Sequence, residues 1–193
     1  MDFIKNYIQD SISVKKKLLE NKDLLERMEK AAQIITTAYK NGGKVLLAGN
    51  GGSAADAQHI AGELVSKFYF DRPGLSALAL TVDTSILTAI GNDYGYERVF
   101  ARQIEANGKD GDVFIGISTS GNSKNILEAL RAAKQKNITT IGLTGENTCQ
   151  MDVLCDITLK IPSQETPKIQ ESHIMIGHIL CAIVEKNLFG QGK

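Results

Sequence analysis

The chain has 193 residues, 42% of them hydrophobic and 23% charged, which suits one globular domain with a buried core. Its 22 basic and 22 acidic side chains cancel to a formal net charge of zero, so no global field attracts nucleic acid or an anionic membrane. We therefore expect neither partner, and any bound anion must be held by local groups. The one basic run, Lys15 to Lys17, is typical of a solvated helix face.

Cysteine usage and hydropathy predict the compartment. Three cysteines, Cys149, Cys155 and Cys181, form no CxxC pair and are an odd number, which disfavours a disulfide framework or a zinc knuckle. The N-terminus lacks the apolar core of a signal peptide, and no segment approaches the ~20 apolar residues of a membrane span. We expect a cytoplasmic protein.

Residues 2–41 carry apolar side chains at helical spacing, for example Ile4, Ile8 and Ile12, with a break near Asn21. This pattern predicts a pair of N-terminal helices.

Five short apolar runs follow, and helical stretches separate most of them. The runs lie at residues 44–49, 75–80, 112–118, 139–145 and 156–161. Strands that alternate with helices form a parallel sheet covered on both faces. The fold class is therefore α/β, a single domain whose five-stranded parallel core spans residues 42–188. A last helix is predicted from about Gln164 to Leu188.

In open α/β sheets the ligand binds beyond the carboxyl ends of the strands, and a hydroxyl-rich loop follows the third strand there. The loop contains Ser118, Thr119, Ser120 and Ser123 and leads into a helix. Hydroxyls together with the free N–H groups of a helix start bind phosphate without arginine or lysine. The alternative is that Ser123 or Asn122 only caps the helix.

A glycine-rich loop follows the first strand and has two interpretations. Gly49, Gly51 and Ala54 match a relaxed dinucleotide-binding fingerprint. However, no acidic residue ends the second strand, where a ribose would need one, and the hydroxyl-rich loop has no role in a dinucleotide site. The favoured interpretation is contact with a sugar chain. The residues concerned are Asn50, Gly51, Gly52 and Ser53.

Two histidines have neighbours suited to a divalent metal. His59 and Glu63 stand at i and i+4 on one predicted helix, on the same face. Gln170 and His178 are eight apart on the last helix, about 80° around its axis. The alternatives are an ordinary helix ion pair for the first two and a core histidine for His178. His173 points elsewhere and is predicted to be structural.

The segments GNGGSAADAQHIAGEL, AIGNDYGYE, GDVFIGISTSGNS and IQESHIMIGH, in this order, resemble the phosphoheptose isomerases of the sugar isomerase (SIS) class. The resemblance implies an aldose–ketose isomerase that converts sedoheptulose 7-phosphate to D-glycero-D-manno-heptose 7-phosphate, for bacterial surface polysaccharides. It also implies a homotetramer with one Zn²⁺ per subunit, and the helices of residues 1–41 are expected to take part in assembly.

The resemblance further implies which residues act. Zinc would be held by His59, Glu63, Gln170 and His178. Substrate would touch Asn50, Gly51, Gly52, Ser53, Glu63, Asn92, Asp93, Ser118, Thr119, Ser120, Ser123 and Gln170. Glu63 would be the base and His178 the second proton-transfer group of an enediolate mechanism.

One position departs from the family pattern, because Pro167 stands where many relatives carry an aspartate.

Two rival hypotheses remain, a protein of another functional class and a protein that acts on another phosphosugar. SIS-fold relatives include non-catalytic proteins, one of which associates with the bacterial replication initiator. That branch loses the acidic residue and the last histidine. This chain has both, Glu63 and His178, which disfavours the non-catalytic hypothesis. An isomerase or sensor for another phosphosugar is the third option, since the loops specify phosphate better than chain length.

Overall fold

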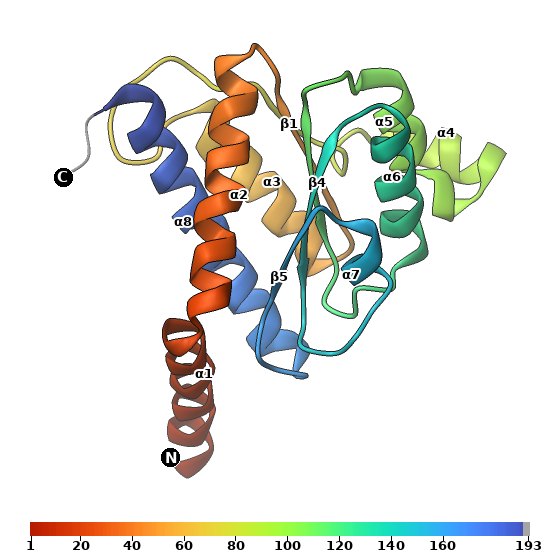
Figure 1. Cartoon of the computed structure of the whole chain (residues 1–193). Helices are drawn as coiled ribbons and strands as arrows, with labels where there is room; N and C mark the ends of the chain where they lie inside the picture. Colours follow the sequence, from red (N-terminus) through yellow and green to blue (C-terminus); the bar gives the residue numbers. More distant parts are fainter. Residues whose placement is uncertain (191–193) are drawn as a thin grey trace.

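The structure, a computed structural model, describes residues 1–190 and has helices on both faces of one parallel sheet (Figure 1). The elements in chain order are α1 (Asp2–Glu20), α2 (Lys22–Lys40), β1 (Val45–Gly49), α3 (Gly52–Val65), β2 (Ala77–Ala79), α4 (Thr84–Tyr94), the 3₁₀ turn η1 (Tyr96–Arg98), α5 (Ala101–Asn107), β3 (Val113–Ile117), α6 (Lys124–Gln135), β4 (Thr139–Thr144), α7 (Met151–Leu154), β5 (Ile157–Lys160) and α8 (Thr166–Phe189).

The five strands are all parallel and lie in the order β2-β1-β3-β4-β5. Every residue of β1 and β3 is buried, as expected for central strands covered by helices on both sides. The α/β fold class and the five strands predicted from the sequence are confirmed. The strand β2 is shorter than the predicted run because it lies at the edge and pairs only with β1.

Two apolar clusters flank the sheet. One lies between the sheet and the helices α2, α3 and α8, and the other between the sheet and α5 and α6 (Figure 1). The chain crosses from β1 to β2 on one side and reaches β3 on the other side of β1. The loops after β1 and β3 therefore meet at a topological switch point, where ligands of open α/β sheets bind.

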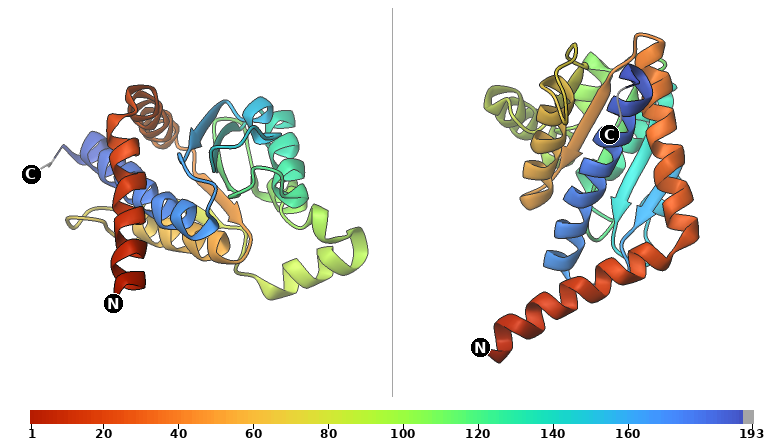
Figure 2. Two further views of the ribbon diagram at one scale, coloured as in Figure 1. Left: turned by 90° about the horizontal axis from the view of Figure 1, so that it is seen from below. Right: turned by 90° about the vertical axis from the view of Figure 1, so that its left-hand side faces the viewer.

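The two N-terminal helices are confirmed, and the break between them falls at Asn21. Its side chain accepts a hydrogen bond from the backbone N–H of Leu24 and so caps α2. Helix α2 packs along α8, whereas α1 extends away from the body of the protein (Figure 2). Only Val14 and Leu18 of α1 are buried.

The last helix begins at Thr166, close to the predicted start, and Pro167 occupies its first turn. Proline is suited to that place because its fixed φ matches the helix and its missing N–H would be unpaired there anyway. Within residues 1–190, none of the helices combines the length and the apolar character that crossing a membrane requires.

Candidate active site

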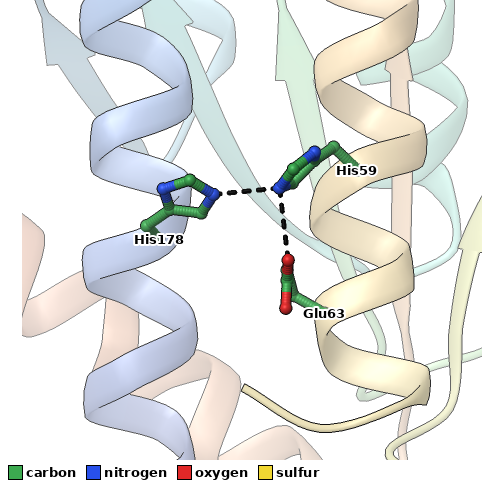
Figure 3. A group of neighbouring side chains, drawn as sticks. All are labelled: His59, Glu63 and His178. Carbon is green, nitrogen blue, oxygen red and sulfur yellow. Dashed lines mark hydrogen bonds and ion pairs between the residues drawn. The ribbon is translucent and has the colours of Figure 1, made fainter. Parts of the chain in front are cut away.

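Three predicted metal ligands from two helices meet at one place (Figure 3). The Nε2 atom of His59 lies 3.2 Å from Oε1 of Glu63 on α3 and 3.0 Å from Nε2 of His178 on α8. One ligand atom from each residue lies within 4.8 Å of the other two. The interpretation of His59 and Glu63 as a mere helix pair is therefore incomplete, since His178 shares their contact.

Glycine makes this meeting of helices possible. Gly177 precedes His178, and a Cβ atom at this position would lie 2.6 Å from Cδ1 of Ile60, the residue that follows His59. Real Cβ atoms do not approach other atoms so closely, so only glycine lets α8 lie this near α3. His59 and His178 adjoin this contact, and their rings lie 5.0 Å apart between centroids, tilted by 54° to each other.

The donor set of this cluster fits a zinc ion. Two imidazole nitrogens and one carboxylate oxygen are ligands that zinc takes in catalytic sites. Tetrahedral zinc with ~2.0–2.1 Å bonds places neighbouring nitrogen donors about 3.3 Å apart. The His59–His178 and His59–Glu63 distances are close to that value. His59 is half exposed, so solvent or substrate reaches the cluster.

Gln170, the fourth predicted ligand, lies in a different place. It stands eight residues before His178 on α8, about 12 Å along the helix axis. A Cβ atom at Gly52 would lie 2.6 Å from Nε2 of Gln170, so the amide packs against the start of α3. The histidine cluster lies about two turns further along both helices. Zinc binding by Gln170 stays a prediction, and its position supports contact with whatever the glycine-rich loop binds.

Asp56 lies one turn before His59 on α3 and has an unusual carboxyl group. Its Oδ2 atom is buried and makes no hydrogen bond to any described residue. Burial raises the pKa of this carboxyl, and the neighbouring His59 partly opposes the rise. A buried oxygen without a partner is costly, so Asp56 is suited to accept a hydrogen bond from a ligand or water at the site.

The hydroxyl-rich loop after β3 forms its own hydrogen-bond cluster. The Oγ atom of Ser118 lies 2.9 Å from Oγ of Ser123 and 3.4 Å from Oγ of Ser120. Ser123 is the N-cap residue of α6, yet its side chain makes no capping hydrogen bond. Asn122 instead accepts a hydrogen bond from the N–H of Gln150. The capping interpretation is wrong, and the hydroxyls remain at the start of a helix, where an anion binds.

The glycine-rich loop after β1 is tied to the same helix. Asn50 and Asn125 exchange two hydrogen bonds, 3.0 Å and 2.8 Å long, between their side-chain amides. Tyr96 donates a third, 3.3 Å long, to Oδ1 of Asn50. The side chain of Asn50 therefore joins the two loops. Gly51 has a φ of 55°, a conformation that favours glycine, directly before α3 begins.

An open cavity of about 480 Å³ lies between these loops. Its lining is Asn50, Gly95, Tyr96, Glu97, Ser123, Lys124 and Asn125. Sequence reasoning missed Asn125, Tyr96 and Lys124. A signal for Asn125 existed, because a polar residue just inside a helix that follows a phosphate-type loop faces the ligand side. Lys124 adds a cation that was not expected.

Asn92 and Asp93 lie apart from these groups. They are exposed on α4, where the Asn92 amide donates to the Asp93 carboxylate over 2.8 Å. Helix α4 has no buried residue and projects from the body of the protein, on the side opposite α8 (Figures 1 and 2). Their contact with substrate stays a prediction.

His173 is structural, as expected. It is buried, its Nε2 atom lies 3.2 Å from the carbonyl oxygen of Thr144, and burial lowers its pKa to about 4 although that hydrogen bond opposes the shift. It takes no part in the cluster of His59 and His178.

Comparison with known proteins shows the family of the chain. The SIS domain family matches residues 6–145. Phosphoheptose isomerase 2 of Campylobacter jejuni is 64% identical over 190 residues, 98% of this chain and 94% of the relative. The phosphoheptose isomerase of Aneurinibacillus thermoaerophilus is 63% identical over 188 residues, 97% of this chain and 95% of the relative.

Solved structures agree in fold. A phosphoheptose isomerase from Francisella tularensis superposes with a TM-score of 0.92 at 38% identity, covering 96% of this chain and 97% of the other. That of Neisseria gonorrhoeae gives 0.90 at 41% identity, covering 96% and 98%. The fold and the switch-point site define a SIS-domain protein. Within that class, the chain belongs to the phosphoheptose isomerase family.

Proposed function

We propose that the chain is an aldose–ketose isomerase that converts sedoheptulose 7-phosphate to D-glycero-D-manno-heptose 7-phosphate. The observation that carries the proposal is the convergence of His59, Glu63 and His178, from two different helices, on one point. The high identity to named phosphoheptose isomerases over nearly the whole chain supports the choice of sugar.

Glu63 is the proposed base. It removes a proton from C1 of the open-chain ketose and returns it to C2, so that the carbon skeleton is unchanged and the carbonyl moves from C2 to C1. Only one of its oxygens, Oε1, faces His59. The other oxygen is left for the substrate, which lets one carboxylate serve both the cluster and the proton transfer.

His178 is the proposed partner in the transfer. The enediolate stage also requires a proton to move between the two substrate oxygens, and an imidazole accepts and donates protons near neutral pH. The ring of His178 lies beside that of Phe68, with 5.7 Å between centroids. This apolar neighbour contacts the ring on one side.

A zinc ion held by His59, Glu63 and His178 would polarise the substrate carbonyl and stabilise negative charge on its oxygen. Gln170, near the glycine-rich loop, is proposed as a substrate contact and, once its side chain turns toward the cluster, as a further zinc ligand. Asp56 is proposed to hold a substrate hydroxyl or a water.

The phosphate is proposed to bind at the start of α6, on the hydroxyls of Ser118, Thr119, Ser120 and Ser123. Asn50, Gly51, Gly52 and Ser53 would face the sugar chain. Since Asn92 and Asp93 lie far out on α4, we propose that they reach the substrate of a neighbouring subunit.

We propose a cytoplasmic homotetramer that serves heptose synthesis for lipopolysaccharide or capsule. Exposed apolar side chains on α1, such as Phe3, Ile4 and Ile8, support a role for the N-terminal helices of residues 1–41 in assembly, around the α/β core of residues 42–188. The fully exposed face of α4 supports a second contact.

The test is incubation with sedoheptulose 7-phosphate, with added zinc or with a chelator, followed by NMR of the sugar. We expect the aldose to form with zinc and to be suppressed by chelation. Glu63→Gln should slow turnover by about 10²–10⁴-fold while leaving the fold intact. Asp23→Asn, which breaks another i,i+4 pair far from the site, is the matched control and should be fully active.

A chain that binds sedoheptulose 7-phosphate without converting it would instead favour the non-catalytic binding protein. Equal or faster conversion of a hexose or pentose phosphate would favour the alternative phosphosugar. Near-normal turnover by Glu63→Gln would remove Glu63 from the role of base.

A further inference from the structure

A buried ion pair between Arg72 and Glu185 joins the two helices of the candidate site. Nε of Arg72 lies 3.0 Å from Oε2 of Glu185, and both side chains are at most 2% exposed. Arg72 stands in the segment between α3 and β2, and Glu185 stands in the last turns of α8. Neither residue belongs to the proposed donor set.

On one side of the pair, Arg72 holds the end of α3. Its Nη2 donates to the carbonyl oxygen of Glu63 over 2.9 Å, and its Nη1 donates to those of Leu64 and Ser66 over 2.6 Å and 3.0 Å. The last carbonyls of a helix have no partner within it, and a cation there is favoured by the helix dipole. Arg72 therefore fixes the backbone of Glu63 itself.

On the other side, Glu185 holds the same segment to α8. Its carboxylate accepts hydrogen bonds from the N–H groups of Phe68 and Tyr69, 2.9 Å and 2.8 Å long, and from Arg72. Burial alone would raise the pKa of Glu185, but these hydrogen bonds and the charge of Arg72 outweigh it and lower the pKa. The carboxylate is thus charged, and both of its oxygens accept hydrogen bonds.

The geometry of α8 connects this carboxylate to His178. The two stand seven positions apart, which is nearly two full turns, so both face α3. Phe68, which Glu185 anchors, also packs against the ring of His178. The backbone of Glu63 and the ring of His178 are thus both held through one ion pair.

We infer that Arg72 and Glu185 are positioning residues, which set the separation of Glu63 and His178 that zinc binding and proton transfer require. This rests on the proposed function. Metal sites tolerate errors of only about 0.2 Å in ligand distance, so a small slip of α3 along α8 is enough to weaken the site. Supporting groups outside the ligand set typically change metal affinity by 10–100-fold.

A second buried carboxylate supplies a matched control. Asp112 also accepts hydrogen bonds from two backbone N–H groups, those of Lys44 and Lys109, and from one cation, the Nζ of Lys44. It lies just before β3, at the amino end of the sheet and so away from the switch point. Asp112→Asn removes the same kind of interaction as Glu185→Gln without touching α3 or α8.

The experiment measures zinc affinity by competition with a chromogenic chelator, together with kcat, KM and Tm, for the full-length chain. We expect both variants to lower Tm. Only Glu185→Gln should lower zinc affinity, by about tenfold or more. It should lower kcat as well, with KM for the phosphosugar within about twofold, because the hydroxyl-rich loop is held by β3 and α6 instead.

If Glu185→Gln fails to fold, Arg72→Lys replaces it, since lysine keeps the charge but lacks the planar fork whose separate nitrogens bond Glu63, Leu64 and Glu185. Loss of zinc affinity in both the site variant and Asp112→Asn, or in neither, would overturn the inference. A wild-type chain that binds no zinc would overturn the metal assignment itself, and the inference with it. If the wild-type chain binds zinc but turns over no heptose phosphate, the proposed function fails. The zinc affinities of the variants then still test the role of the ion pair.

Discussion

His59 and His178 come from different helices, and their Nε2 atoms lie 3.0 Å apart. Two imidazole nitrogens at this distance need a proton or a cation between them, because two lone pairs that face each other repel. The nearby Glu63 carboxylate adds negative charge to the same point. Either a metal ion or a shared proton must therefore lie between these two nitrogens.

Substitution of His178 should separate metal binding from stability. We expect His178→Gln to lose zinc, measured by metal analysis after dialysis, while its Tm stays within a few degrees of wild type because this ring faces an open site. The control is His173→Gln on the same helix. His173 is buried, so this variant should lose stability yet retain about one zinc per chain. Full zinc content in His178→Gln would contradict the ligand assignment.

Substitution of Ser123 distinguishes a role in phosphate binding from a role as a helix cap. Since this side chain makes no capping bond, Ser123→Ala should lose only its hydrogen bond to Ser118, worth about 1 kcal/mol of stability. It should raise KM for the phosphosugar by about tenfold, the effect of one lost charge-assisted hydrogen bond. Asn21→Ala removes a true cap and is the control. It should cost about 1 kcal/mol of stability and leave KM alone. An unchanged KM in Ser123→Ala would remove this hydroxyl from the phosphate site.

Local patterns were sufficient to predict most of the fold. The five strands are short and mostly apolar, and the glycines and hydroxyls that follow β1 and β3 mark the loops at the switch point. The i,i+4 spacing placed His59 and Glu63 correctly because one helix determines both positions. The positions of His173 and His178 on one helix likewise predicted that His173 faces away from the site.

Contacts between elements could not be predicted in this way. The side chain of Gln170 packs against Gly52, which depends on how closely α8 approaches α3, and helical spacing says nothing of that distance. The amide pair of Asn50 and Asn125 links residues 75 positions apart. Arg72 and Glu185 stand 113 positions apart, and each alone resembles an ordinary surface charge. Burial and pairing decide their roles, and only the folded chain shows them.

Assembly should depend on the exposed apolar face of α1. Ile8 is 54% exposed, and burying it against another copy would favour association. We expect Ile8→Asp to shift the proposed tetramer to smaller species in light scattering coupled to size exclusion. Asn6→Asp adds the same charge about 200° around the helix and should leave the assembly intact. A tetramer that persists in Ile8→Asp would place the interface elsewhere.

Buried His173 should make stability depend on pH in a definite window. Burial lowers its pKa to about 4 in the folded chain, whereas an unfolded histidine titrates near 6.5. The unfolded state therefore binds the proton more readily, and the contribution is fully present above about pH 6.5 and is lost as the pH falls toward 4. At about 1.4 kcal/mol per pKa unit, the loss approaches about 3 kcal/mol.

The difference between wild type and His173→Gln isolates this effect from other titrating groups. Urea unfolding at pH 7, 6 and 5 should show a free energy of unfolding that falls more steeply with acid for wild type than for the variant. Thr36→Val is the control, because Thr36 is buried and does not titrate. That variant should be less stable by a similar amount at every pH. Parallel pH curves for wild type and His173→Gln would show that His173 is not held neutral by burial.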